Sequence, residues 1–280
     1  QMCIRDSIST ERSDVQYSVK ELSGFMAVPR TCDWTNVKRL ARYLLGKPRT
    51  VLVYGYQKQQ FLDTWTDTDF AGCRSERKST SGGLIMHGSH CLKSWSSTQS
   101  IIAGSTGEAE YYGLVKGGSN SLGMRALMED LGVCGVKLRL KSDASAAIGI
   151  ASRRGLGEIR HLEVSQLWLQ QKVANGDLEL IKVNGEDNLA DALTKHLGAG
   201  DLQRHMVGVG LEERGGRHAI MPDVAQDGEE EYTVQMVPGE DEEGNILETV
   251  QFGNGRETGL EPPRNFAGKW EHCKFPGIID

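Results

Sequence analysis

The pattern of apolar and polar residues along the middle of the chain indicates short strands followed by a helix. Strand-like segments lie at 61–70, 81–88 and 91–97, and a long helical stretch then runs from about Thr106 to Leu131. Three short strands followed by a helix predict an antiparallel meander with the helix packed on it.

A second series of elements follows that helix. Val136, Leu138 and Leu140 alternate with basic residues, which predicts a further strand. This strand ends at Ser142 and Asp143, and a helix begins at once. Asp143 therefore lies at the C-terminal end of a strand, the edge at which open α/β sheets bind ligands. The remaining segments predict a helix at 161–176, a strand at 178–183 and a last helix at 187–197.

Two amphipathic helices are predicted upstream of the strands. Their apolar stripes are Val15, Val19, Leu22 and Met26 in the first helix, and Val37, Leu40, Ala41 and Leu44 in the second. Asp33 is placed to cap the second helix, Gly46 to end it and Pro48 to prevent its continuation. Residues 1–13 lack periodicity and are predicted to be a non-native or disordered N-terminus.

Charge is distributed unevenly along the chain. The net charge is −6, but residues 211–280 carry 16 acidic and 6 basic side chains, which leaves the upstream part with a charge of +4. This acidic tail has little apolar periodicity, so it is predicted to be disordered, with a segment that folds on a partner as the alternative. The mildly basic body suits a polyanionic partner.

Apolar run lengths and cysteine positions bear on location. No apolar run approaches the roughly 18 to 20 residues that span a bilayer, so we expect no membrane partner and an intracellular location. The six cysteines are scattered, without a C-x-x-C pair, which predicts free thiols and neither a disulfide framework nor a zinc site.

The stretch WTDTDFAG, residues 65–72, places two aspartates on one strand. Asp67 and Asp69 are two positions apart and therefore share a face, together with Trp65. A pair of carboxylates on one face is costly unless a cation sits on it, whereas a solvated strand end could carry both at the surface. The spacing alone leaves both interpretations open.

Four acids occupy suggestive places in the predicted elements. Asp67 lies on the first strand, Glu110 in the first turns of the long helix, Asp143 at the end of the fourth strand and Asp191 in the last helix. Each one alone is typical of a structural or surface position. If they converge, their repulsion requires divalent cations, and Mg²⁺ suits a site made only of oxygen. Two such ions can drive phosphodiester hydrolysis.

Five blocks of the chain, taken in order, resemble a known family. They are WTDTDFAGCRSERKSTSGGLIM, SWSSTQSIIAGSTGEAEYYGL, KSDASAAIGIA, RHLEVSQLWLQQKV and DNLADALTK. This order resembles the ribonuclease H domain of copia-type LTR retrotransposon Pol polyproteins, and the resemblance covers about residues 61–200. It implies an α/β, ribonuclease H-like fold at 59–210, with a five-stranded mixed sheet and helices on both faces. Residues 14–58 resemble the helical connection from the reverse transcriptase, which leaves 211–280 as the tail.

The resemblance also implies an activity. Such domains hydrolyse the RNA strand of RNA/DNA hybrids with Mg²⁺, for which Mn²⁺ can substitute, and the reverse transcriptase region of the same polyprotein is a partner. The catalytic and metal-binding acids of the family match Asp67, Glu110, Asp143 and Asp191, so that Asp69 is an accessory acid. The implied location is the cytoplasm, within virus-like particles, or the nucleus.

Contacts to the nucleic acid are expected at the surface. Ser105 and Thr106 match positions that contact the backbone in this fold, with helix N-capping as the competing role. Arg74 and Lys78 could meet phosphates, or form part of a solvated charge pattern. His161 matches a histidine common in its block, with a surface histidine at a helix start as the alternative.

Two departures keep other functions open. The loop between the last strand and the last helix has no histidine, unlike that of cellular ribonucleases H. The long helix carries Gly113, Gly117, Gly118 and Gly123, which indicates either close packing or a decayed copy. The alternatives are a catalytically inactive nucleic-acid-binding or structural module from a decayed element, and an integrase or transposase nuclease that acts on DNA ends.

Overall fold

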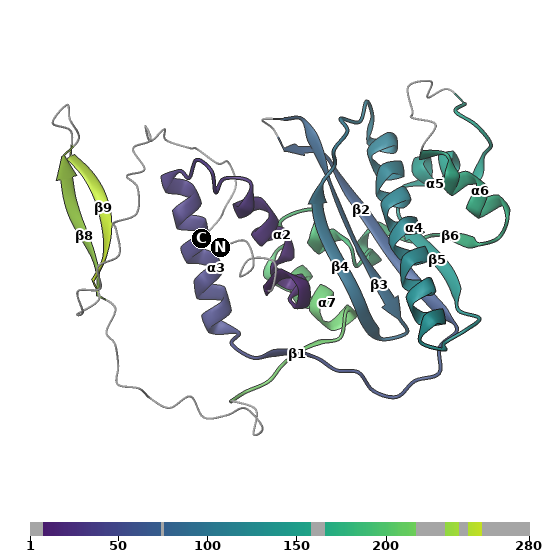
Figure 1. Cartoon of the computed structure of the whole chain (residues 1–280), viewed down its shortest axis with the longest axis horizontal. Coiled ribbons are helices and arrows are strands. Elements are labelled where there is room, and N and C mark those ends of the chain that lie inside the picture. The colour runs from purple at the N-terminus through teal and green to yellow at the C-terminus, as the bar shows by residue number, and fades with distance from the viewer. Residues whose placement is uncertain (1–7, 74–75, 158–165, 217–232, 241–245, 254–280) are drawn as a thin grey trace. The chain divides into compact units, whose positions relative to one another are not determined.

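The computed structural model describes most of the chain, which divides into two compact units (Figure 1). The first unit includes the described residues up to Gly215, and the second lies within 216–269. The described residues are 8–73, 76–157, 166–216, 233–240 and 246–253.

A five-stranded mixed sheet organises the first unit, with the strand order β4-β3-β2-β5-β6. Its strands are β2 (Phe61–Cys73), β3 (Lys78–His87), β4 (His90–Thr98), β5 (Lys137–Ser142) and β6 (Leu178–Lys182). The first three pair antiparallel, and β5 and β6 continue parallel to β2. An antiparallel meander extended by two parallel strands confirms the predicted ribonuclease H-like topology.

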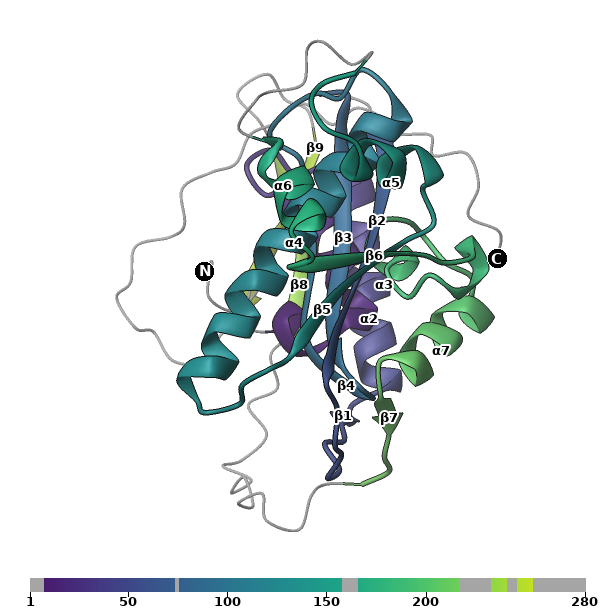
Figure 2. The same ribbon diagram turned by 90° about the vertical axis from the view of Figure 1, so that its right-hand side faces the viewer.

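Helices cover both faces of this sheet, as Figures 1 and 2 show. On one face lies α4 (Thr106–Asp130), with α5 (Ser145–Ser152) and α6 (Trp168–Ala174) packed beyond it. On the other face are α2 (Ser13–Ser23), α7 (Ala199–Gly208) and the 3-10 turn η3 (Asp191–Leu193). The remaining elements of this unit are α3 (Thr31–Gly46), β1 (Thr50–Leu52), the 3-10 turn η2 (Gly185–Asp187) and β7 (Leu211–Glu213).

Strand alternation divides the core into two clusters. Ile85 faces α4 and joins a cluster with Leu62 and Leu140, whereas its neighbour Leu84 faces the opposite side and packs with Leu193. Leu62, Leu84, Ile85 and Leu140 are all fully buried. β3 is buried on both faces, so its consecutive apolar residues Leu84, Ile85 and Met86 do not alternate with polar ones.

Close packing explains Gly113, Gly117 and Gly118, three of the five glycines in α4. A Cβ at Gly117 would lie 2.5 Å from Cγ2 of Thr66, and one at Gly113 would lie 2.5 Å from Oγ1 of Thr68. Gly118 faces Leu169 at 3.0 Å, while Gly123 has nothing within 4 Å. The glycines therefore let α4 approach the central strand β2, which carries Asp67.

Two glycine substitutions should have opposite effects on stability. Gly117→Ala should destabilise the chain by about 1–3 kcal/mol, because the new methyl group forces α4 away from β2. Gly123→Ala should stabilise it by about 0.5–1 kcal/mol, because alanine is the better helix former in open space. Urea denaturation of both variants measures the difference, and equal effects would contradict the packing role of Gly117.

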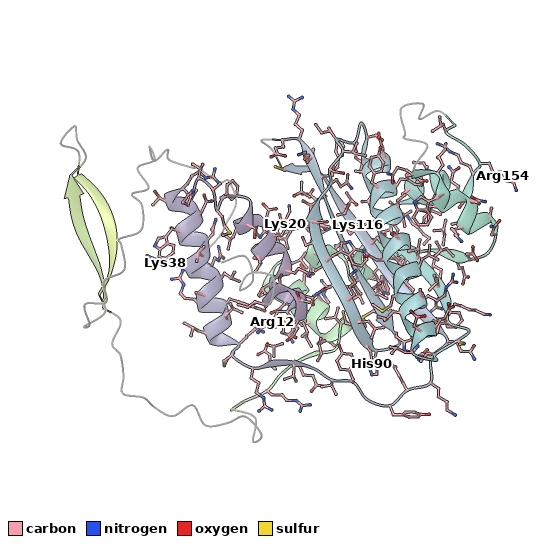
Figure 3. The ribbon with its side chains drawn as sticks, viewed as in Figure 1. Arg12, Lys20, Lys38, His90, Lys116 and Arg154 are labelled. Atoms are coloured by element: carbon pink, nitrogen blue, oxygen red, sulfur yellow. The ribbon has the colours of Figure 1, made fainter. Side chains whose placement is uncertain are left out.

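The upstream helix α2 is part of the first unit. It packs against β4 and η3, and Gln16 donates from Nε2 to the backbone carbonyl of Ser94 at 3.3 Å. The buried carboxylate of Asp14 accepts hydrogen bonds from Arg12 and, at 2.7 Å, from the hydroxyl of Tyr43. Figure 3 labels Arg12 at the start of this helix. Helices α2 and α3 are thus tied to each other and, through α2, to the sheet.

Of two sequence expectations about helix ends, one is confirmed in part and one is wrong. Asp33 takes part in capping α3, but as its third residue and not as the N-cap: its carboxylate accepts a hydrogen bond from the backbone of the N-cap residue Arg30. The last helix, predicted at 187–197, is broken into short turns, so Asp191 lies in the 3-10 turn η3. Side-chain bonds compete with the helix there: Asn188 accepts from the backbone of Ala190, and Thr194 donates to the carbonyl of Asp191.

The tail is more structured than its charge predicts. β7 pairs antiparallel with β1, and Leu211 is buried in the second core cluster. The second unit contains a hairpin of β8 (Thr233–Glu240) and β9 (Ile246–Gly253). β-branched and aromatic residues in both strands favour this pairing, which net charge does not reveal. The assignment of the whole tail as disordered is therefore not supported at these three strands.

Two expectations about membrane and cysteines can be compared with the described residues. No helix among them combines the length and apolar character needed to cross a membrane. Cys32, Cys73, Cys91 and Cys134, the cysteines that the structure describes, form no disulfide bond with one another.

Candidate active site

Asp67 lies near the centre of the sheet on β2. It is 6% exposed and lies opposite Gly82 of β3, where a Cβ would come within 2.7 Å of Leu193 and Thr194. This lack of a side chain lets η3 pack directly on the sheet beside Asp67. The hydroxyl of Thr194 then donates a hydrogen bond to the carboxylate of Asp67.

Asp143 reaches the same edge from β5. Because β2 and β5 are parallel, their C-terminal ends meet at one edge of the sheet. Asn188 links the two strands there, since its amide Nδ2 donates to the carbonyl of Thr66 at 3.1 Å and to Oδ1 of Asp143 at 3.3 Å. Asn188 is itself buried, so it holds the Asp143 side chain beside β2.

Glu110 comes from the second turn of α4 and is 8% exposed. Burial, together with repulsion from Asp67 and Asp143, raises its pKa to about 9. Its Oε2 is buried and has no hydrogen-bond partner. Glu108, two residues earlier, accepts instead from the backbone of Gly104 and the hydroxyl of Tyr112, so it supports the helix start.

Asp191 completes the group from η3. Its Oδ2 pairs with the ammonium of Lys195 at 2.8 Å, while its Oδ1 is buried without a partner. Burial raises the pKa of Asp191, an effect that the hydrogen bond from Lys195 opposes.

Each of the four acids interacts electrostatically with at least one of the others. Burial raises the pKa of Asp67 to about 6; the hydrogen bond from Thr194 opposes this rise, and the charges of Asp191 and Asp143 add to it. Asp69 shares the strand face of Asp67 but interacts with α2. Burial raises its pKa, an effect that Lys20 opposes and Glu21 reinforces. The structure therefore places Asp67, and not Asp69, with the other three acids.

The donor set fits a hard divalent cation. All the candidate ligands are carboxylate oxygens, the ligand type that Mg²⁺ and Mn²⁺ prefer, and the buried Oε2 of Glu110 and Oδ1 of Asp191 have no hydrogen-bond partner among the described residues. However, no three histidine, cysteine or carboxylate side chains within the described ranges are arranged to hold one metal ion. The acids are thus near one another and mutually repelled, and holding a cation would require their side chains to draw together.

The nucleic-acid candidates lie at varied places. Ser105 is the N-cap of α4 and accepts from the backbone of Glu108 at 3.2 Å, which is the competing role foreseen for it, and Thr106 is exposed in the first helical turn. Lys78 pairs with Glu76 at the surface. Arg74 and His161 lie outside the described residues.

Three site residues were missed by the sequence analysis. Asn188, Thr194 and Lys195 each bond to one of the four acids. The signal was present in DNLADALTK, where polar residues flank Asp191 on both sides among apolar ones. Only the contacts assign each of them to its acid.

The chain is similar in sequence to known polyproteins. The chain is 29% identical over 185 residues to the retrovirus-related Pol polyprotein from transposon TNT 1-94 of Nicotiana tabacum, covering 66% of this chain and 14% of that protein. It is 28% identical over 203 residues to the retrovirus-related Pol polyprotein from transposon RE1 of Arabidopsis thaliana, covering 71% and 14%. The chain therefore spans about one seventh of the length of these curated relatives.

Part of the chain is also similar to a solved structure. LC11-RNase H1, isolated from compost by a metagenomic approach, is 16% identical with a TM-score of 0.35, covering 49% of this chain and 94% of that one. No family model matches the chain. On the strand order and the sequence matches, this chain is a homologue of the retrovirus-related Pol polyproteins of copia-type transposons, and its body has the ribonuclease H-like fold.

Proposed function

We propose that this chain is the ribonuclease H module of a retrotransposon Pol polyprotein, a metal-dependent endonuclease that hydrolyses the RNA strand of RNA/DNA hybrids. The observation that carries the proposal is the convergence of Asp67, Glu110, Asp143 and Asp191. They come from four separate elements and raise the free energy of the metal-free site by mutual repulsion. Burial of like charges without compensation is costly, and such strain is typical of functional sites.

The residues of this chain divide the work between ligands and supports. The four acids would hold Mg²⁺ or Mn²⁺, which supplies Lewis-acid activation of water and neutralises charge on the phosphate. Thr194 orients the carboxylate of Asp67, and Asn188 orients that of Asp143. No side-chain nucleophile is required, because water attacks the phosphorus in this class of hydrolysis.

The substrate proposal rests on the shape of the nucleic acid. A hybrid has a wide, shallow minor groove with 2′-hydroxyls on one strand only, so a protein can select the RNA strand without reading bases. Ser105 and Thr106 are exposed at the N-terminus of α4, the helix that carries Glu110, and a helix N-terminus attracts phosphate. The reverse transcriptase region of the same polyprotein is the proposed partner.

One observation favours the second candidate, a catalytically inactive nucleic-acid-binding or structural module. Within the described residues no three acids are arranged to hold a metal ion. If the site could not contract around a cation, the fold would bind nucleic acid without cutting it.

Cleavage of two matched substrates, an RNA/DNA hybrid and duplex DNA, tests the proposal. The purified chain should cut the labelled RNA strand of an RNA/DNA hybrid with Mg²⁺ or Mn²⁺, leave the same sequence as duplex DNA intact, and lose activity in chelator or with rising salt. Preferential cutting of duplex DNA would favour an integrase or transposase nuclease. Hybrid binding without cleavage in either metal would favour the inactive module.

A further inference from the structure

Lys195 is a cation placed inside the acidic site. It lies two residues after η3, and its ammonium pairs with Oδ2 of Asp191 at 2.8 Å. The Lys195 side chain is 49% exposed and the Asp191 side chain is 23% exposed. The lysine therefore faces solvent more than its partner does.

The charge of Lys195 reaches beyond its direct partner. Burial lowers the pKa of its ammonium, but the hydrogen bond to Asp191 and attraction to Asp67, Asp191 and Asp143 outweigh this effect, so the pKa is raised overall. The same charge stabilises the ionised form of Asp67 and of Glu110. One lysine therefore offsets part of the repulsion among all four acids.

Lys182, a second nearby lysine, has a different arrangement. Its ammonium donates to the backbone carbonyl of Asp143 and to the hydroxyl of Ser145, at 2.6 Å for the latter. Neither acceptor is a carboxylate of the site. Lys182 thus holds the loop after β5, while Lys195 neutralises carboxylate charge.

We propose that Lys195 is a built-in counter-ion, which neutralises Asp191 in the metal-free site and which a divalent cation must displace from Asp191. The proposal rests on the proposed function for the identity of the cation. Lys195 occupies Oδ2 of Asp191, and a divalent cation at this carboxylate meets the like charge of the ammonium. The lysine therefore lowers the affinity for metal while stabilising the metal-free fold, and its ammonium is released toward solvent when metal binds.

Magnesium titration and metal-free melting of the full chain test the two halves of this proposal. Lys195→Met removes the charge and keeps the length of the stem, and Lys195→Arg keeps the charge. The control is Lys172→Met, which removes a similarly exposed lysine of α6. Lys172 pairs with Asp177 at 3.0 Å and lies away from the four acids of the site. Calorimetry with MgCl₂, without nucleic acid, measures affinity, and melting in chelator measures stability.

Lys195→Met should bind Mg²⁺ on the order of three- to tenfold more tightly than the native chain, because an opposing charge has been removed. In chelator it should melt about 2–4 °C lower, with Lys172→Met and Lys195→Arg close to native. Adding Asp191→Asn to Lys195→Met should restore the melting temperature, which a loss of stem packing would not allow.

Unchanged or weaker Mg²⁺ binding by Lys195→Met would overturn the displacement by metal. An unchanged melting temperature in chelator would overturn the counter-ion role, whatever the metal does. If neither the native chain nor Lys195→Met bound Mg²⁺ while the melting shift was present, the proposed function would fail and the displacement with it, but the counter-ion role would stand.

Discussion

Replacing Asp67 with asparagine should reduce hybrid cleavage about a thousandfold, because metal-mediated stabilisation of the transition state contributes several kcal/mol. Asp67 lies on the central strand β2. Its charge raises the pKa of Glu110 in α4, and the charges of Asp143 and Asp191 raise the pKa of Asp67. Asparagine has the same shape and keeps an oxygen to accept the hydrogen bond from Thr194. The chain should therefore fold normally, and single-turnover cleavage of a hybrid at saturating enzyme measures the loss.

Asp69→Asn is the matched control for this variant. Asp69 lies on the same strand and the same face, but its neighbours are Lys20 and Glu21 of α2. Lys20 donates to Oγ1 of Thr80 at 2.8 Å, and Figure 3 labels it between α2 and the sheet. Asp69→Asn should therefore retain most of the activity. Equal losses in both variants, or full activity in Asp67→Asn, would refute the assignment of Asp67 as the metal-binding acid of this strand.

Glu110→Gln should stabilise the metal-free chain by on the order of 3 kcal/mol at pH 7, since a pKa raised from 4.5 to about 9 makes the folded state protonate this acid. A raised pKa contributes stability that is fully present below the unfolded pKa and is lost as pH rises through the folded pKa. The native chain should thus lose stability between about pH 4.5 and 9, while Glu110→Gln lacks this dependence. The gap between the two should close near pH 4.

Thermal melting in chelator across this pH range measures the effect, and Glu108→Gln is its control. Glu108 is also buried and lies two residues away, but its carboxylate accepts from the backbone of Gly104 and from the hydroxyl of Tyr112. Removing its charge should destabilise the chain by about 1–3 kcal/mol. With saturating Mg²⁺ the advantage of Glu110→Gln should vanish, because metal binding stabilises the native acid. If Glu110→Gln melted at a lower temperature than the native chain in chelator, the claim that the charge of Glu110 destabilises the metal-free site would be wrong.

Local sequence patterns are enough to predict the strands of the sheet and the order in which the four acids occur along the chain. Strand alternation and helical periodicity are local properties, so β2 to β6 and α4 lie where the pattern predicts them. The position of Asp143 at a strand end also follows from local pattern. The family resemblance named the same four acids that the structure brings together.

Contacts in the tertiary structure show which polar groups touch those acids and how the irregular segments are held in place. Asp67 and Asp69 are equivalent by spacing, and packing of η3 on one and α2 near the other separates them. The broken last helix and the pairing of β7 with β1 depend on side-chain bonds and on contacts between residues distant in sequence. Periodicity carries no information about such contacts, because it records which face a residue occupies and not which neighbour that face meets.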